Sequence, residues 1–429
     1  MTTRSRAGLL ALALSSALAL GCASVVTGQE VQSAAGATAT AVSQASPQPT
    51  ATPTTATPTA PVSAIFNDPW STKRSKQYRI TTAQLRLIKA TKRGAVITLM
   101  TYSISDTDVA KALIAAKKRG VAVRVLVDDH SKYKATKTLR AKLGTNKRAK
   151  SYVARCYLAC ASDVTYPDKI HDTTTRPYQH AKALAVSKAG SDRYVVVIPS
   201  GNLTSAAAST QANEAIVVKG DKAVYDFVVG RFTRMIRDNG GTAATISSGT
   251  VTLRQYPEVP KKVILEPKPT DDPYAALLDD ITCVKDGTAT RIDIAMYMWS
   301  FPRAYLATRL AKLSASGCDV RVVGPITKKG QDGKIWDPQV VKALRSGGDI
   351  ELWQVDPKRV LHSKYVVIDG WDADGNRLRS VSAGSPNFLL QALFYSDELA
   401  VATTDESVVD AYQADFEHLL ADHSKQVSR

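Results

Sequence analysis

The sequence lacks an apolar run of the length that a transmembrane helix needs. The run from Leu9 to Leu20 falls short of the about 20 residues that cross a bilayer as a helix. Cysteine is also scarce, with 5 in 429 residues. The two closest, Cys156 and Cys160, have no paired histidine or second close cysteine pair beside them, which is poor spacing for zinc. The sequence therefore predicts no ordinary membrane span and suggests no metal ion or other cofactor.

The N-terminus has the layout of a secretory signal peptide. Arg4 and Arg6 precede the apolar run and small residues follow it, so we expect residues 1–22 to be a signal peptide. The LGC tripeptide that ends at Cys22 is similar to the cleavage site of a bacterial lipoprotein, in which the cysteine is acylated, although alanine precedes it where leucine is usual. Two fates stay open: secretion, or anchoring through Cys22 to the outer face of the bacterial cell membrane.

Residues 23–64 are expected to form a disordered linker. From about residue 33 this segment is almost entirely Ala, Thr, Ser, Pro, Gln and Val, with PTATPTTATPTAP at its centre. It has too little apolar bulk to fold and too much proline for a regular helix. We expect an extended stalk, which suits a tether at Cys22 but also suits a simple spacer in a secreted protein.

The chain is strongly basic, with a formal net charge of +17. Such a surplus attracts anionic partners, either a phospholipid membrane surface or nucleic acid. The lysines and arginines are widely dispersed, with local clusters at KKRG and NKRAK, and dispersed basic residues usually form a solvated surface. The charge therefore permits both partners and does not choose between them.

One short polar pattern occurs twice. His180 and Lys182 lie in QHAKALAVS, and His362 and Lys364 lie in LHSKYVVID. Each pattern lies in or beside an apolar, β-branched run that predicts a strand. Residues two apart in a strand project from the same face. Each histidine and its lysine should therefore point into one space, as an acid–base group beside a cation.

The surroundings of the two patterns also match, which indicates an internal repeat. Upstream of each, a predicted strand leads to an amphipathic helix that ends at a glycine before another strand. Downstream lie polar residues at nearly equal offsets: Gly201, Asn202 and Glu214 after the first pattern, and Gly384, Ser385, Asn387 and Glu398 after the second. We expect two similar α/β halves, at residues 65–245 and 246–429.

These residues resemble the phospholipase D superfamily, whose signature is His-x-Lys followed after four further residues by Asp, usually present twice. The second copy fits fully, with Asp369 after Lys364 and then the Gly-Ser-x-Asn element at residues 384–387. The first copy departs from the signature, because Ser187 stands where the family has Asp. In the family this Asp supports local structure and is not a reacting group. The resemblance covers residues 76–424.

The resemblance implies a phospholipase D-like fold. Two similar α/β halves with mixed sheets would be related by pseudo-twofold symmetry, with the active site between them. Because both copies of the motif lie in one chain, we expect a monomer.

The resemblance also implies a mechanism. One neutral imidazole attacks phosphorus and a protonated imidazole donates to the leaving oxygen. Lys182, Lys364, Asn202 and Asn387 would stabilise the charge on the phosphoryl oxygens. In two-copy lipases of the family the first histidine is usually the nucleophile, which assigns attack to His180 and the general acid to His362.

Glu214 and Glu398 match the family's downstream acidic residue. That residue hydrogen-bonds the other imidazole nitrogen, which fixes the tautomer. The alternative is that each glutamate begins a strand at the protein surface.

Three functions stay open. The first is an exported phosphodiesterase that hydrolyses phospholipid headgroups through a phosphohistidine intermediate, with transphosphatidylation as a variant. The second is an extracellular nuclease of the same superfamily. The third is a catalytically weakened module that binds a phosphate ligand, and Ser187 is its only motivation.

The four cysteines after Cys22 are expected to form disulfides in an exported protein. Of the three pairings we favour Cys156 with Cys160 and Cys283 with Cys318, because each pair falls within one half. His130 has no counterpart in the second half, so we expect it to be a surface or loop residue.

Overall fold

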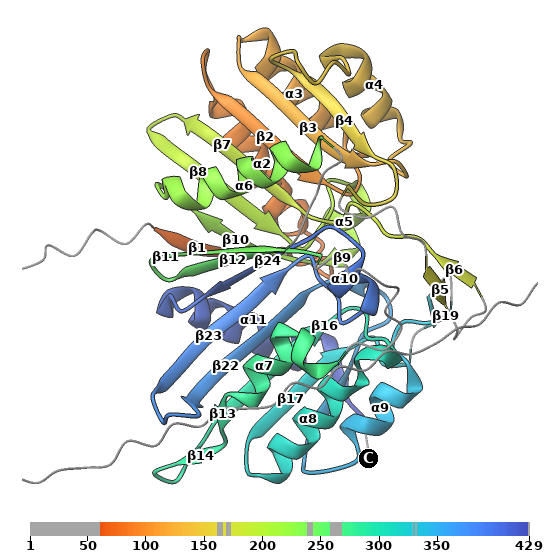
Figure 1. The fold of residues 1–429 in the computed structure, drawn as a ribbon, viewed down its shortest axis with the longest axis vertical. Helices are drawn as coiled ribbons and strands as arrows, with labels where there is room; N and C mark the ends of the chain where they lie inside the picture. The colour runs from red at the N-terminus through yellow and green to blue at the C-terminus, as the bar shows by residue number, and fades with distance from the viewer. Residues whose placement is uncertain are drawn as a thin grey trace, which may run out of the picture. The chain divides into compact units, whose positions relative to one another are not determined.

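Two mixed β-sheets organise the chain, one in each half of the repeat (Figure 1). The computed structural model describes residues 61–160, 166–168, 173–237, 243–257, 268–327, 329–330 and 333–427. The expected signal peptide, Cys22 and most of the expected linker lie outside these residues. None of the helices in the described ranges combines the length and apolar character needed to cross a bilayer.

The first sheet has seven strands. Their order is β1 (Val62–Phe66), β10 (Glu214–Val218), β8 (Asp192–Pro199), β7 (Ala183–Ala189), β2 (Val96–Thr101), β3 (Ala122–Asp128) and β4 (Tyr152–Cys156). Strands β2, β3 and β4 run parallel, whereas β7 is antiparallel to β2 and to β8. Strand β1 begins at Val62, slightly before the expected start of this half.

The second sheet repeats this order and extends it. Its path is β11 (Ala244–Ser248), β12 (Val251–Tyr256), β24 (Glu398–Thr403), β23 (Arg377–Gly384), β22 (Lys364–Asp372), β16 (Arg291–Met296), β17 (Asp319–Gly324), β20 (Glu351–Val355) and β25 (Ser424–Gln426). Strands β16, β17 and β20 are parallel, as β2, β3 and β4 are in the first sheet. The repeated α/β architecture expected from the sequence is confirmed, and the division expected at residue 245 falls inside β11.

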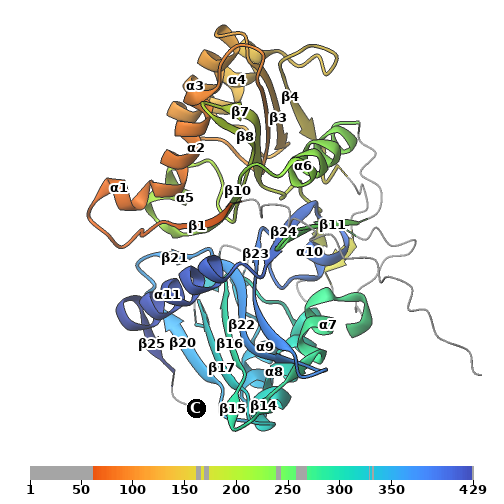
Figure 2. The ribbon, with the colours of Figure 1, turned by 90° about the vertical axis from the view of Figure 1, so that its left-hand side faces the viewer.

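Helices cover both faces of the first sheet (Figure 2). Helices α2 (Arg79–Ala90), α3 (Thr107–Lys118) and α4 (Lys134–Leu143) pack on one face, and α6 (Lys222–Met235) packs on the other. The sequence of β8 is continuously apolar because a strand covered on both faces buries both sets of side chains. Val195 and Val197 enter one core, and Val196 and Ile198 enter the other.

The crossover helices begin and end where the sequence indicates. The carboxylate of Asp106 accepts from the backbone N–H of Asp108 at 2.8 Å and caps α3, as small polar residues do at helix N-termini. Gly120 follows the helix with φ +86°, a conformation that favours glycine. In the second half α8 (Ala304–Ala315) ends in the same way before Gly317, whose φ is +97°.

The two halves share a hydrophobic core. One cluster of buried residues contains Val196 of the first sheet, Val367 of the second and Tyr412 of helix α11 (Glu406–His423). The ring of Phe66 in β1 meets Tyr412 edge to face at 4.8 Å between centroids. Contacts of this kind fix the two sheets relative to each other, and therefore fix the groups that each half contributes to the site.

The remaining elements are short. They are the helices α1 (Arg74–Gln77), α5 (Ser205–Ser209), α7 (Pro273–Asp279), α9 (Pro338–Leu344) and α10 (Leu390–Phe394), and the strands β5 (Tyr166–Asp168), β6 (Thr173–Thr175), β9 (Gln211–Ala212), β13 (Ile281–Thr282), β14 (Val284–Lys285), β15 (Thr288–Ala289), β18 (Lys329–Gly330), β19 (Gly333–Lys334) and β21 (Val360–Leu361).

Candidate active site

Each His-x-Lys motif lies where a strand begins and where the chain touches the other half. His180 precedes β7, and its backbone N–H donates to the carbonyl of Asp397 at 2.9 Å. His362 precedes β22, and its N–H donates to the carbonyl of Ala212 at 2.9 Å. Just before it, β21 pairs with β9 of the first half. The backbone of each histidine is therefore held by the opposite half.

The imidazole of His180 is held by a carboxylate from the second half. Its Nδ1 lies 2.8 Å from Oε1 and 2.9 Å from Oε2 of Glu398. Burial raises the pKa of Glu398, but His180 and Lys182 more than offset this, so its pKa lies below the ordinary value. The ionised carboxylate accepts the Nδ1 proton, which leaves the Nε2 lone pair of a neutral imidazole available for attack.

The imidazole of His362 is held by an amide from the first half. Its Nδ1 lies 2.8 Å from Oδ1 of Asn213. The amide nitrogen of Asn213 donates to the carbonyls of Ala207 at 2.9 Å and Gln211 at 3.1 Å, which turns the amide oxygen towards His362. Since an amide oxygen only accepts, we assign the proton on this histidine to Nδ1, with Nε2 again facing the site.

Glu214 does not have the role that the sequence predicted. Its Oε1 accepts from the backbone N–H of Lys364 at 3.2 Å, while Asn213 takes the imidazole. The strand pairing explains the error. Ser200 N–H bonds to the carbonyl of Glu214 and Ser385 N–H to that of Leu399, so Glu214 corresponds to Leu399 and Asn213 corresponds to Glu398.

Both glutamates are buried, with 1% of Glu214 and 2% of Glu398 exposed. The alternative that they begin strands at the surface is therefore excluded.

The two lysines are buried beside their histidines and are 1% exposed. Lys182 Nζ donates to the carbonyl of His180 at 2.7 Å. Lys364 Nζ donates to the carbonyl of His362 and lies 3.0 Å from its Nδ1. Burial lowers the pKa of Lys182 to about 7. Burial and then the charge of Lys182 hold the pKa of Lys364 well below its ordinary value.

The basic side chains of the site disfavour one another's charged forms while no anion is bound. Burial, and next the charge of Lys364, holds the pKa of His362 well below its ordinary value. Burial also lowers the pKa of His180, against the opposing effect of Glu398. An anionic group placed among these side chains would favour their charged forms. The arrangement is therefore suited to a phosphate-bearing ligand.

Small residues at the ends of β8 and β23 pack against the segments that carry Asn213 and Glu398, the two groups that hold the imidazoles. Ser385 Oγ accepts from the N–H of Leu399 at 2.9 Å. A Cβ on Gly384 would lie 2.4 Å from the carbonyl oxygen of Leu399, and a Cβ on Gly201 would lie 2.8 Å from Cγ of Asn213. Only glycine fits such close approaches.

The two predicted asparagines differ. Oδ1 of Asn202 is buried without a hydrogen-bond partner among the described residues, so it can accept from a donor on a ligand. Asn387 is held in place: its Oδ1 accepts from the N–H of Met298 at 3.3 Å, and its carbonyl accepts from Arg303 at 3.0 Å.

Asp369 and Ser187 bind other parts of the fold. Asp369 lies towards the far end of β22, where it accepts from Arg379 at 3.2 Å and from Gln413 of α11 at 2.9 Å. Ser187 Oγ accepts from the N–H of Val96 in β2 at 2.9 Å. Both residues join neighbouring elements and neither contacts a motif histidine. The loss of the signature Asp in the first copy thus alters a structural contact.

An aromatic and acidic cluster lies beside His180. The ring of Tyr102 lies 5.9 Å from that of His180 and 6.3 Å from that of His130. His130 Nδ1 contacts Oδ1 of Asp128 at 2.6 Å, and burial raises the pKa of Asp128 to about 6. His130 lies in the turn after β3 and is exposed, as the sequence predicted, at the edge of the site. Asp128 was not predicted from the sequence, and its signal was its place at the end of β3, the parallel neighbour of β2.

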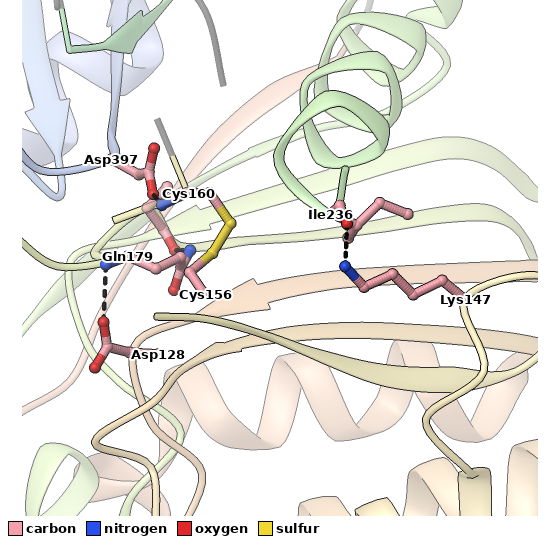
Figure 3. The surroundings of a disulfide bond; sticks show 8 residues. Asp128, Lys147, Cys156, Cys160, Gln179, Ile236 and Asp397 are labelled. Atoms are coloured by element: carbon pink, nitrogen blue, oxygen red, sulfur yellow. Dashed lines mark hydrogen bonds between the residues drawn. A yellow bond between two sulfur atoms is a disulfide. The ribbon is translucent and has the colours of Figure 1, made fainter. Parts of the chain in front are cut away.

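Both expected disulfides form, Cys156 with Cys160 and Cys283 with Cys318. The first one braces the site (Figure 3). The backbone N–H of Cys160 donates to the buried carboxylate of Asp397 at 2.6 Å. Since Asp397 also accepts the N–H of His180 and precedes Glu398, the disulfide loop lies against the segment that positions the imidazole.

The chain matches the model of a phospholipase D-like family. The model of the family described as "Cardiolipin synthase, PLD-like domain" matches residues 85–236 and 285–420, one segment in each half. No curated protein matches the sequence.

Two solved structures with TM-scores above 0.5 share the fold. Polyphosphate kinase from Porphyromonas gingivalis is 15% identical with a TM-score of 0.52, over 84% of this chain and 51% of that chain, so this chain spans about half of the kinase. Phosphatidylserine synthase from Haemophilus influenzae Rd KW20 is 11% identical with a TM-score of 0.53, over 85% of this chain and 87% of that one. Nuc from Salmonella typhimurium, a phospholipase D family member, is 23% identical with a TM-score of 0.28, over 42% of this chain and 95% of that one. The chain belongs to the cardiolipin synthase, phospholipase D-like domain family, within the phospholipase D superfamily.

Proposed function

We propose that this protein is an exported phosphodiesterase of the phospholipase D type, which hydrolyses the headgroup phosphodiester bond of phospholipids. The observation that carries the reaction type is the pair of histidines, His180 half-buried and His362 buried, each held through Nδ1 by the opposite half. The phospholipid substrate is supported by the description of the matching family, and the positive charge of the chain is compatible with it. Export is supported by the N-terminal sequence.

The proposed reaction has two displacements. In the first, Nε2 of His180 forms a bond to phosphorus as the bond from phosphorus to the headgroup oxygen breaks. A proton on Nε2 of His362 passes to that oxygen. In the second, water attacks the phosphohistidine, returns a proton to His362 and releases His180. An alcohol in place of water gives transphosphatidylation.

The low pKa of His362 fits this sequence of events. In the free protein its imidazole is neutral, because burial and the nearby Lys364 disfavour the charged form. A bound phosphodiester brings negative charge to the same space and favours protonation of His362. The general acid would therefore be charged when substrate is present.

The proposal is tested by turnover of the full chain in EDTA, on phosphatidylcholine vesicles and single-stranded DNA in parallel. We expect choline release, with DNA left intact and with turnover abolished in His180→Ala and His362→Ala. DNA cleavage without choline release would move the assignment to the nuclease alternative. If neither substrate were cleaved while both variants kept the parent's ligand affinity, the weakened binding module would be the correct description.

A further inference from the structure

A basic cavity lies beside the histidine site, at the outer edge of the first sheet. Its volume is about 530 Å³, and its wall follows β4 and the facing helix α4. The charged and aromatic residues of this wall are Asp129, Lys132, Arg140, Lys147, Arg155 and Tyr157. No step of the proposed reaction uses them.

The topology places this cavity close to the catalytic groups. Strands β2, β3 and β4 are parallel neighbours, so their C-terminal ends meet at one edge of the sheet. Tyr102, which contacts His180, follows β2, Asp129 follows β3, and Tyr157 follows β4. At about 4.8 Å between neighbouring strands, Asp129 lies about one strand spacing from Tyr102 and Tyr157 lies about two, or about 10 Å. A membrane that reaches the catalytic groups would also lie near the cavity.

The positive charge of the cavity is poorly compensated. Four of its side chains are basic and one is acidic. Among the described residues, Lys132, Arg140 and Arg155 have no side-chain hydrogen bond and no ion pair. Burial and the charge of Arg155 lower the pKa of Arg140, which shows that the two arginines repel each other. By contrast, the buried Arg303 is paired with Asp272 at 2.8 Å.

Two exposed tyrosines lie at this cavity. Tyr157 is 68% exposed and Tyr133, next to Lys132, is 50% exposed. They are two of the four exposed large hydrophobic side chains in the described part of the chain. Tyrosine is favoured where an apolar phase meets water, because its ring is apolar and its hydroxyl is polar. Basic residues near a membrane surface are attracted to anionic lipids.

We propose that this cavity binds the phosphate headgroup of an anionic phospholipid and holds the protein on a membrane beside the catalytic site. The basic side chains converge on one hollow, which suits a compact headgroup better than an extended nucleic-acid strand. The proposal rests on the phospholipid substrate proposed above, because only then does a membrane anchor serve the reaction.

The test compares binding of the full chain to two kinds of vesicle by sedimentation. One kind is phosphatidylcholine alone, and the other is equal parts of phosphatidylcholine and phosphatidylglycerol. The variant is Arg140→Glu with Arg155→Glu. Its matched control, Lys312→Glu with Lys342→Glu, changes the net charge equally at exposed positions of α8 and α9 in the second half.

We expect the cavity variant to weaken binding to the anionic vesicles about tenfold or more, and the control variant to weaken it much less. Turnover of the soluble phosphodiester bis(p-nitrophenyl) phosphate should be unchanged in both, because neither pair touches the histidines. If the doubly substituted protein fails to fold by circular dichroism, Arg140→Gln with Arg155→Gln replaces it.

Equal weakening in the two variants would overturn the proposal, because binding would then follow net charge alone. The proposal would also be overturned if the cavity variant lost binding to single-stranded DNA while vesicle binding did not depend on phosphatidylglycerol. Failure of the proposed function is a separate result, since absence of phosphodiester turnover in the parent protein leaves the vesicle-binding comparison readable.

Discussion

His180 and His362 differ in the group that holds Nδ1, and this difference assigns their roles. Attack by Nε2 on phosphorus leaves positive charge on the imidazole, and a carboxylate such as Glu398 stabilises that charge. The amide of Asn213 fixes the tautomer of His362 without adding negative charge. This difference supports the proposed roles, with His180 as the nucleophile and His362 as the general acid.

Replacing the carboxylate tests the role of Glu398. In Glu398→Gln the amide can donate to Nδ1, which favours the wrong tautomer, so kcat should fall on the order of a hundredfold or more. Glu398 also raises the pKa of His180, so its loss lowers that pKa. The acid limb of kcat/KM, where His180 becomes protonated, should move to lower pH. An unchanged limb, or a similar loss of kcat in the control Glu417→Gln, would contradict this role.

At Asn213 the opposite replacement, of an amide by a carboxylate, is available. In Asn213→Asp a carboxylate faces His362, which stabilises the imidazolium and raises its pKa. The general acid then stays protonated to higher pH, so the basic limb of kcat/KM should move upward, whereas Asn213→Ala should lower kcat without that shift. A pH profile identical to that of the parent would show that Asn213 does not act on His362.

At the scale of single elements, the ends of strands and short loops position the chemistry. The disulfide loop at residues 156–160 bonds to Asp397, whose carbonyl holds the backbone of His180. In Cys156→Ser with Cys160→Ser this brace is loosened, and we expect kcat to fall about tenfold, the equivalent of about 1.4 kcal/mol in the barrier. The shorter loop should cost about 2 kcal/mol of unfolding free energy.

The other disulfide is the matched control. Cys283 and Cys318 are 35 residues apart, so their removal should cost about 4 kcal/mol of unfolding free energy while kcat of the folded protein is kept. Chemical denaturation and initial rates measure the two effects separately. If removal of the first disulfide leaves kcat unchanged, the brace has no catalytic consequence.

Gly384 shows how closely the strands approach at the site. Its φ is +129°, and an added Cβ would lie 2.4 Å from the carbonyl of Leu399. Gly384→Ala should lower the unfolding free energy by about 1–3 kcal/mol and reduce kcat, because Glu398 precedes Leu399. Gly190→Ala is the control: its φ is +60° with open space around it, so it should cost less stability and no activity.

At the scale of the whole molecule, neither half contains a complete site. Glu398 serves the histidine of the first half and Asn213 serves that of the second. The sequence predicted the repeat, the α/β halves and the His-x-Lys strands, because these depend on local patterns. It misassigned Glu214, because the sequence separation of corresponding residues in the two halves is not the same at the downstream strands as at the histidines. It did not point to Asp128 beside the site, because parallel strand order is a long-range property.

The central claim is that His180 is the nucleophile, and a trapped intermediate tests it directly. The full chain is mixed with phospholipid carrying radiolabelled phosphorus, quenched with base within one turnover and digested to peptides. We expect label on the peptide that contains His180, and none in His180→Ala. Label on the peptide that contains His362, or labelling that survives in His180→Ala, would contradict it.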